Sequence, residues 1–295
     1  MVEKMKTNVC APINLKVGNY DVFCLQDSHF AVDGGAMFHV VPKILWEKKI
    51  APDKDNRIFL GLNCLLLKGE GRTILFDTGI GNKLSEKLRN IYKIDPDTTL
   101  MNSFKTIDVS PHQIDTVILS HLHLDHTGWC TVRNENNKLV RTFPNARYIV
   151  QESEWEAAHK TNELTKGSYI PDDYDPLIDS GALTLVNGDY QVTSSIKLEL
   201  TGAHSPGHQI MKISSGQDSM ICPCEMIPTP YHLKPAWVSS FDIEPMRVLD
   251  IKKQIIKEAS ELNCLLFLSH TAVDFFGRIR AISSKDYAWE PLNRH

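Results

Sequence analysis

Residues 121–126 read His-Leu-His-Leu-Asp-His and hold three imidazoles and a carboxylate within six positions. Borderline metals such as zinc favour imidazole, and carboxylates let a second cation lie close by and share charge. His121 and His123 project from one extended strand end and can clamp one ion, whereas Asp125 and His126 follow a turn and face a neighbouring position. The spacing therefore predicts two adjacent, incomplete metal sites.

Buried strands are expected to deliver these ligands to loops. Residues 115–120, directly before the cluster, are apolar and β-branched, which is typical of a strand that ends where the histidines begin. His204 follows the predicted strand 196–200, and His270 follows an apolar run near the C-terminus. We expect these two histidines to complete the two sites, with Glu225 as the candidate bridging ligand.

The predicted strand 72–76 ends in Asp77, for which two roles are open. A carboxylate ahead of a glycine is a common turn former. It can also accept the free N–H of a ligand histidine and so fix the tautomer of that ring.

The order of the predicted elements indicates one domain over residues 1–295. Strands, helices, further strands, a helix and a strand follow one another without a compositional break, a low-complexity segment or a tandem repeat. The last helix is marked by an apolar stripe on a 3.6-residue repeat, with Asp242 or Glu244 as its cap. The stripe consists of Val248, Ile251, Ile255, Ala259 and Leu262. One α/β domain of stacked layers fits this order best.

Two segments without clear periodicity are candidates for covering a pocket. Residues 26–58 form an N-terminal loop or flap that either packs against the core or closes over a pocket. In the second case Phe38, His39 and Trp46 would touch the substrate. Residues 161–181 form an irregular insertion that is a candidate lid.

Composition points to an ordinary globular protein and away from nucleic-acid and membrane partners. The chain is 42% hydrophobic and 23% charged, which is ordinary for a globular fold with a sizeable core. A net charge of -4 and a pI near 6.3 do not indicate the excess of Lys and Arg that binding to nucleic acid or an anionic membrane needs. Neither an apolar leader nor the ~20 apolar residues of a spanning helix is visible. We therefore expect a cytoplasmic protein with no nucleic-acid or membrane partner. We also expect a monomer or homodimer, and the resemblance given below implies a small-molecule substrate.

Seven scattered cysteines lack CxxC spacing, so neither a disulfide framework nor a zinc ribbon is indicated. Most are expected to be buried thiols. They are Cys10, Cys24, Cys64, Cys130, Cys222, Cys224 and Cys264.

Four motifs, found in the family's order, resemble those of the metallo-β-lactamase superfamily over residues 60–278. They are HxHxDH at residues 121–126, Gly-Ala-His-Ser-Pro-Gly at 202–207, Asp-Thr-Gly at 77–79, and a last histidine, His270, ahead of Phe276-Gly277. The resemblance implies an αββα four-layer sandwich with a dinuclear metal site at one edge. It also implies that one metal is bound by His121, His123 and His204, and the other by Asp125, His126 and His270.

One position departs from the family pattern. Many members have a bridging aspartate where this chain has Glu225, whose side chain is one methylene longer and changes the bridging geometry. The neighbouring Cys224 is a rival ligand, because some members place a thiolate hereabouts. The alternative for Cys224 is an inert buried thiol.

The resemblance implies two divalent metal ions, zinc ahead of iron or manganese, which deprotonate a shared water and polarise the target oxygen. Asp125 would orient the attacking hydroxide. Tyr231 or His232, just beyond Glu225, would donate to the oxyanion or the leaving group. We expect hydrolysis of a carboxylic ester or lactone, with phosphotriester as a side activity, as in the lactonase and organophosphate-hydrolase branch.

Two other functional classes stay open. Superfamily relatives that oxidise persulfides hold a single iron by two histidines and an aspartate, and the matching positions here are His121, His204 and Glu225. A metal-binding protein without catalysis is the other alternative. Glyoxalase II-like thioesterases carry a helical domain after the last histidine, where 25 residues follow here, and the processing nucleases need basic RNA-binding elements. Neither class is expected.

Overall fold

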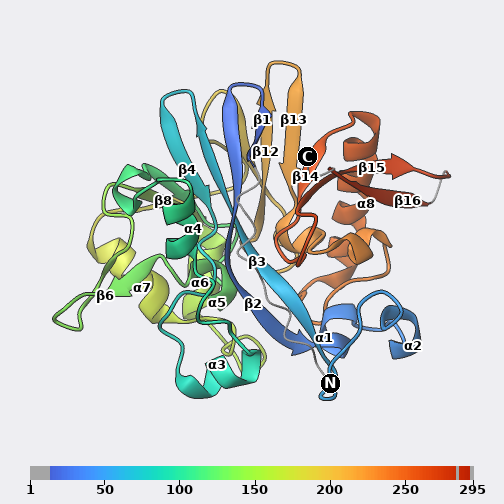
Figure 1. The fold of residues 1–295 in the computed structure, drawn as a ribbon, viewed down its shortest axis with the longest axis horizontal. Coiled ribbons are helices and arrows are strands. Elements are labelled where there is room, and N and C mark those ends of the chain that lie inside the picture. Colours follow the sequence, from blue (N-terminus) through green and yellow to red (C-terminus); the bar gives the residue numbers. More distant parts are fainter. Residues whose placement is uncertain (1–13, 284–285, 293–295) are drawn as a thin grey trace.

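The computed structural model describes residues 14–283 and 286–292, so Cys10 lies outside the described residues. Two seven-stranded sheets pack face to face at its centre (Figure 1). The strand order of the first sheet is β1-β2-β3-β4-β5-β8-β9. Its strands are β1 (Asn14–Val17), β2 (Tyr20–Asp33), β3 (Arg57–Gly69), β4 (Arg72–Phe76), β5 (Thr116–Ile118), β8 (Arg147–Gln151) and β9 (Leu183–Val186).

The second sheet runs in chain order from β10 to β16. Its strands are β10 (Tyr190–Gln191), β11 (Ile196–Leu200), β12 (Gln209–Ser215), β13 (Asp218–Cys222), β14 (Leu265–Phe267), β15 (Phe276–Ala281) and β16 (Tyr287–Pro291). A separate two-stranded hairpin pairs β6 (Thr131–Arg133) with β7 (Leu139–Arg141).

The helices of the described residues are α1 (Gly34–Phe38), α2 (Lys43–Trp46), α3 (Glu86–Tyr92), α4 (Leu100–Thr106), α5 (Leu124–Thr127), α6 (Glu152–His159), α7 (Pro171–Asp179) and α8 (Pro245–Glu261), with 3-10 turns η1 (Pro111–Gln113), η2 (Cys224–Met226) and η3 (Pro230–Leu233). Helices α4, α6 and α7 pack on the outer face of the first sheet and α8 on that of the second (Figure 1). Within the described residues, no helix has the length and apolar character needed to cross a bilayer.

Separate apolar clusters hold the four layers together. Between the sheets, Leu65 and Ile118 of the first belong to the same buried cluster as Met211 and Phe267 of the second. Phe104 of α4 and Tyr174 of α7 belong to the cluster on the outer face of the first sheet. Val248 and Ile255 of α8 belong to the cluster on the outer face of the second. These layers are those of the predicted αββα sandwich.

Parallel strand pairs bring distant chemical groups to one sheet edge. In the first sheet β4 lies parallel to β5, and in the second β13 lies parallel to β14. The carboxyl ends of parallel neighbours point the same way. Asp77 follows β4, His121 follows β5, Glu225 follows β13 and His270 follows β14. The register therefore gathers groups nearly 200 positions apart in sequence.

The expectation of a loop over residues 26–58 is wrong at both ends. Strand β2 continues to Asp33 and pairs with β3 along its whole length, across one irregularity between Gln26 and Ser28. Phe30 and Val32 on this extension are buried, and that burial favours the strand over a free loop. Only the two short helices α1 and α2 and their connections remain outside the sheet.

The segment 161–181 is not irregular throughout, because it contains helix α7. Pro171 occupies the first turn of this helix, and Asp172 and Asp173 follow it there. Proline and acidic residues are both favoured at a helix N-terminus. Tyr174 and Leu177 are fully buried, so packing against the first sheet stabilises the helix although Pro176 lies inside it.

Candidate metal centre

The predicted histidine and aspartate ligands meet in two clusters at this sheet edge. In each cluster the ligand atoms lie within 4.8 Å of one another. One cluster is His121, His123 and His204, and the other is Asp125, His126 and His270. Each combines residues from the loop after β5 and helix α5 with a histidine from the second sheet. The structure brings the predicted sets together, and their binding of metal stays a prediction.

The imidazole geometry fits bound cations. His204 Nε2 lies 3.1 Å from His123 Nδ1, close to the ~3.3 Å between two nitrogens bound tetrahedrally at about 2.05 Å. In the described part of the chain, Nε2 of His121 and Nε2 of His126 are buried without a hydrogen-bond partner. An unsatisfied buried polar atom costs about 1–3 kcal/mol. A metal ion at each position would remove that cost.

Electrostatics differ between the two clusters. Burial and the neighbouring imidazoles hold the pKa of His121 and of His123 well below the usual value, which favours the neutral form that binds metal. Burial also acts to lower the pKa of His126, but the Asp125 and Asp77 carboxylates outweigh it and raise that pKa well above its usual value. Carboxylates around His126 therefore favour positive charge at this position, which a cation would supply.

Glu225 lies against the second cluster. Its Oε1 is 2.6 Å from His270 Nε2 and 3.5 Å from His126 Nε2. Burial alone would raise the pKa of Glu225, but His270 and His126 hold it well below the usual value, so the group is a carboxylate. Cys224, the rival ligand, is fully buried beside His121 and His126. Both residues of the predicted bridging position thus reach the centre.

Asp77 has the second of its two predicted roles. Its Oδ2 lies 2.9 Å from His126 Nδ1, so the carboxylate accepts the N–H of that ring and directs Nε2 to the centre. Its other oxygen accepts the Ser120 backbone N–H at 2.7 Å. The predicted contact between Asp77 and a candidate ligand histidine is therefore present, and metal binding by that histidine stays a prediction.

Asp242 orients His204 in the same way. Its Oδ1 lies 2.8 Å from His204 Nδ1, so the prediction that it might cap α8 is wrong. Glu244 occupies the cap position and makes no side-chain capping bond there. His270 Nδ1 is held by the Gly61 carbonyl at 3.0 Å. The sequence could have suggested Asp242 only through its carboxylate type, because 38 positions separate it from its partner.

Glu154 is a functional residue that sequence reasoning missed. It is fully buried on α6, and its Oε1 accepts the Leu122 backbone N–H at 3.0 Å. Its Oε2 accepts the Ser205 hydroxyl at 2.6 Å and the Gly207 N–H at 2.9 Å. One carboxylate therefore ties the loop of His121 to the turn of His204. In sequence it looks like any acidic residue in the first turn of a helix.

The ligands border a pocket with apolar walls. Strands β2 and β3 and helix α1 supply much of this wall, and residues 241 and 124 extend it. The apolar lining includes Phe30, Val32, Met37, Leu60, Leu124 and Phe241. The predicted ligand histidines 121, 123, 126, 204 and 270, with Asp125 and Glu225, line the same pocket.

The residues of the N-terminal segment that were expected to touch substrate do not line the pocket. Within the described chain, Phe38, His39 and Trp46 are absent from the pocket wall. Phe38 and Trp46 are buried and stack with ring centroids 5.4 Å apart. Their neighbour Met37 faces the pocket instead. Packing of the two aromatic rings in the core thus replaces the predicted contact.

His232 is not placed to donate a proton to a leaving group. Its Nε2 donates to the Met37 carbonyl at 3.0 Å, and its Nδ1 lies 2.8 Å from Thr229 Oγ1. Both ring nitrogens are engaged and the ring is buried against Phe38. The prediction that His232 donates to the oxyanion or the leaving group is therefore wrong. Tyr231 is half-buried and is not part of the described pocket wall, so its role as a donor stays a prediction.

Comparison with known proteins agrees with the fold and the ligand pattern. An αββα sandwich with five histidines, an aspartate and a glutamate at one edge defines a class of metal-binding proteins. The sequence profile of the Metallo-beta-lactamase superfamily matches residues 57–237. The chain belongs to this superfamily.

Relatives and solved structures include lactonases. An N-acyl homoserine lactonase of Bacillus thuringiensis is 30% identical over 169 residues, which are 54% of this chain and 60% of that protein. The match therefore spans less than two thirds of the relative's length.

A probable metal-dependent hydrolase from Staphylococcus aureus superposes with a TM-score of 0.87 at 27% identity, covering 95% of this chain and 100% of the other. AidC, described as a dizinc quorum-quenching lactonase with a bound product, has a TM-score of 0.77 at 23% identity and covers 97% and 98% of the two chains. At that identity the AidC likeness concerns the fold alone.

Proposed function

We propose that this protein is a metal-dependent hydrolase that opens a lactone ring, or cleaves a carboxylic ester, in a small molecule with an apolar chain. The observation that carries the proposal is the adjacency of two ligand clusters and an apolar wall in one pocket. The lactonase relatives support the same bond type.

The ligand sets described above would hold two divalent cations, zinc being the preferred metal for imidazole-rich sites. When bound, such ions supply a nucleophile from water near neutral pH and polarise a carbonyl oxygen. Glu225 lies against His126 and His270 and is placed to hold the second ion. The bonds from Asp77 and Asp242 keep His126 and His204 in the tautomers that present Nε2.

Asp125 is suited to orient the attacking water. Its side chain is 16% exposed, whereas those of His126 and His270 are each 3% exposed, so part of the carboxylate faces the pocket. An exposed carboxylate oxygen can accept a hydrogen bond from water and hold its proton as the carbonyl is attacked.

The apolar wall would bind the chain of the substrate. The Phe30 ring lies 5.5 Å from the His270 ring, centroid to centroid, so the wall begins directly at a ligand. Each methylene buried there stabilises the complex by about 0.8 kcal/mol. A long acyl or alkyl group would thus be held beside the reacting carbonyl.

Nothing in the contacts of Glu225 favours the mononuclear iron alternative. That arrangement needs Glu225 to share one ion with His121 and His204, yet the short contacts of its carboxylate are with His270 and His126.

Metal analysis and a substrate panel test the proposal. Protein purified without added metal is analysed for bound ions and then assayed on acylated homoserine lactones, aryl esters and a phosphotriester. Two ions with lactone or ester turnover support hydrolysis. One iron with thiol-dependent oxygen uptake would overturn it, and failure to bind metal after supplementation would overturn every enzymatic function considered.

A further inference from the structure

We infer that Tyr169 is a positioning residue of the proposed metal centre, because its ring holds His123 in the orientation that directs Nδ1 to the centre. The ion concerned is the one that His121, His123 and His204 would bind. The inference rests on metal binding at the proposed site but does not depend on which bond is hydrolysed.

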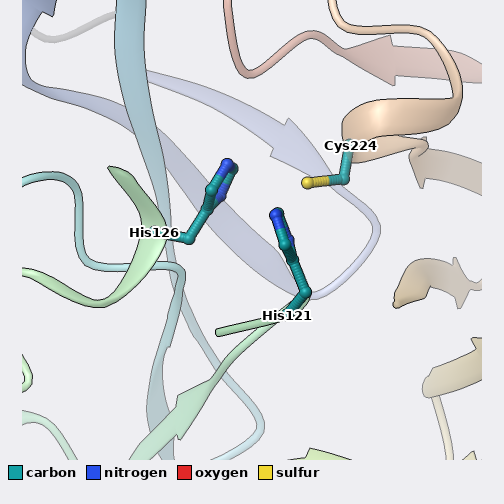
Figure 2. Close-up of side chains that lie close together, drawn as sticks. All are labelled: His121, His126 and Cys224. Atoms are coloured by element: carbon teal, nitrogen blue, oxygen red, sulfur yellow. The ribbon is translucent and has the colours of Figure 1, made fainter. Parts of the chain in front are cut away.

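The other predicted ligand histidines are each oriented by a contact at Nδ1. Nδ1 lies 2.9 Å from Ser120 Oγ in His121, 2.9 Å from Asp77 Oδ2 in His126, 2.8 Å from Asp242 Oδ1 in His204 and 3.0 Å from the Gly61 carbonyl oxygen in His270. Such contacts fix a ring and direct its Nε2 to the centre. Figure 2 shows the rings of His121 and His126 directed at one space from different sides.

His123 is the exception among these histidines. Its Nδ1 lies 3.1 Å from His204 Nε2, so this nitrogen faces the centre and the ring proton belongs on Nε2. Within the part of the chain that the structure describes, Nε2 of His123 has no hydrogen-bond partner. The orientation of this ring must therefore come from packing.

The Tyr169 ring supplies that packing. The centroids of the Tyr169 and His123 rings lie 4.9 Å apart, and their planes meet at 69°, the edge-to-face geometry that aromatic pairs prefer. The main chain fixes the same pair, because His123 and Tyr169 form an isolated antiparallel bridge. Next to it, the Leu124 N–H donates to the Ser168 carbonyl oxygen at 2.8 Å. The backbone of Tyr169 thus holds its ring against the imidazole.

The Tyr169 hydroxyl anchors the far end of the ring. It donates to Glu154 Oε1 at 3.1 Å, and the same oxygen accepts the Leu122 backbone N–H at 3.0 Å. Burial and the Glu154 carboxylate raise the pKa of Tyr169, so the hydroxyl keeps its proton and stays a donor. Tyr169 is therefore fixed to the loop of His123 both directly and through Glu154.

The neighbouring Ser168 connects this support to the pocket, whose wall it helps to form. Its N–H donates to the Thr165 carbonyl oxygen at 3.0 Å, and its own carbonyl oxygen is held by Leu124. Moving residues 168 and 169 away from the pocket would break their bonds to the loop that carries His123. This part of the segment 161–181 would then act as a fixed wall.

Tyr174 offers a matched control on the same segment. It is buried together with Tyr169 in the apolar cluster on the outer face of the first sheet. Its ring contacts are with Trp155 and His159, and neither is a predicted ligand. Tyr174→Leu should therefore lower stability, as Tyr169→Leu does, but leave metal binding unchanged.

Zinc titration in competition with a chromophoric chelator compares these variants. We expect Tyr169→Leu to lower the affinity for one of two ions about 10-fold or more, as when an outer partner of a ligand is lost. Tyr169→Phe keeps the ring and should recover most of that loss, and Tyr174→Leu should match the wild type. Wild-type affinity in Tyr169→Leu would overturn the inference. A loss of equal size in Tyr169→Phe or in Tyr174→Leu would also overturn it.

Nitrogen NMR of the zinc-loaded protein, prepared with isotope-labelled histidine, identifies the affected ring. His123 should bind zinc through Nδ1, and the other predicted ligand histidines should bind through Nε2. In Tyr169→Leu the signals of the Nδ1-bound ring should change, while those of the Nε2-bound rings stay. Unchanged signals from the Nδ1-bound ring would overturn the inference. A wild-type spectrum without such a ring would do so without any mutation.

The same measurements separate this inference from the proposed function. A wild type that binds no zinc would overturn both. The expected loss of affinity in Tyr169→Leu, with no turnover of lactones or esters by the wild type, would leave the inference standing and remove the proposed function. Turnover by the wild type with unchanged zinc binding in Tyr169→Leu would do the opposite.

Discussion

His208 Nε2 accepts a hydrogen bond of 3.3 Å from the backbone N–H of Glu225. Because that nitrogen is an acceptor, the proton of the ring lies on Nδ1, which donates to Thr201 Oγ1 at 2.7 Å. Burial and the nearby His204 hold the pKa of His208 well below its usual value and keep the ring neutral. This histidine lies next to the ligands and fixes the turn that carries Glu225.

Replacing His208 should therefore weaken metal binding through Glu225. We expect His208→Leu to lower zinc affinity about 10-fold or more, because outer partners of metal ligands have effects of this size. His208→Gln keeps an acceptor for the Glu225 N–H and should restore part of the affinity. Competition with a chromophoric chelator measures both, and equal losses in the two variants would contradict this role.

Glu154 should contribute strongly to stability, since its carboxylate accepts bonds from both ligand loops. In Glu154→Gln the amide NH₂ would face other donors, and we expect a loss of about 2–3 kcal/mol in the free energy of unfolding. Urea denaturation measures it. Glu156→Gln, on the exposed side of the same helix, should change stability by less than ~0.5 kcal/mol.

Glu225→Gln should lose one of two bound metals and reduce kcat about 100-fold or more. This loss is expected to exceed that from mutating a residue that only hydrogen-bonds to a ligand. The amide keeps the shape but removes the charge that faces His270 and His126. Glu225→Asp keeps a carboxylate and should retain two metals. Metal analysis alongside kinetics distinguishes the variants, and full metal content in Glu225→Gln would rule out a ligand role.

Phe30 should determine how well long chains are accepted. Phe30→Ala removes wall area beside His270, so kcat/KM should fall about 10-fold for long-chain acyl lactones and much less for short-chain ones. Phe59→Ala is the control, because Phe59 lies on the neighbouring strand and is 40% exposed. A uniform loss across chain lengths would count against the predicted wall contact.

Lys252 should make stability depend on pH in the alkaline range. It is buried, and burial lowers its pKa from 10.5 to about 8, against an opposing effect of Asp242. Between these two values the unfolded chain binds more protons than the folded one, so the free energy of unfolding rises with pH. The expected rise is on the order of 3 kcal/mol. Lys252→Met should flatten this part of the profile, and an unchanged slope relative to wild type would refute it.

Local patterns predicted much of the scaffold. Strands β4 and β11 have the predicted bounds, because short alternating or apolar runs were closed by turn residues. That these histidines would meet followed from their placement at strand ends, and their binding of metal stays a prediction. The role of Asp77 was one of two hypotheses, since a strand-terminal carboxylate is visible in sequence and the identity of its partner is not.

Long-range packing explains what sequence patterns missed. Glu154 and Asp242 act on loops 51 and 38 positions away, and neither carries a local mark of that role. The sequence predicted that Phe38 and Trp46 would line the pocket. In the structure Phe30 and Val32 line it instead, because β2 pairs with β3 as far as Asp33. Which aromatic side chains face the pocket thus depends on the pairing of β2 with β3, which local sequence patterns do not reveal.

The position of His270 after β14 gives the two clusters different spans along the chain. His121, His123 and His204 all precede β12, whereas the cluster of Asp125 and His126 also needs His270, which follows β14 of the second sheet. A metal ion bound by this second cluster would therefore act as a cross-link between the two sheets, across nearly half of the sequence.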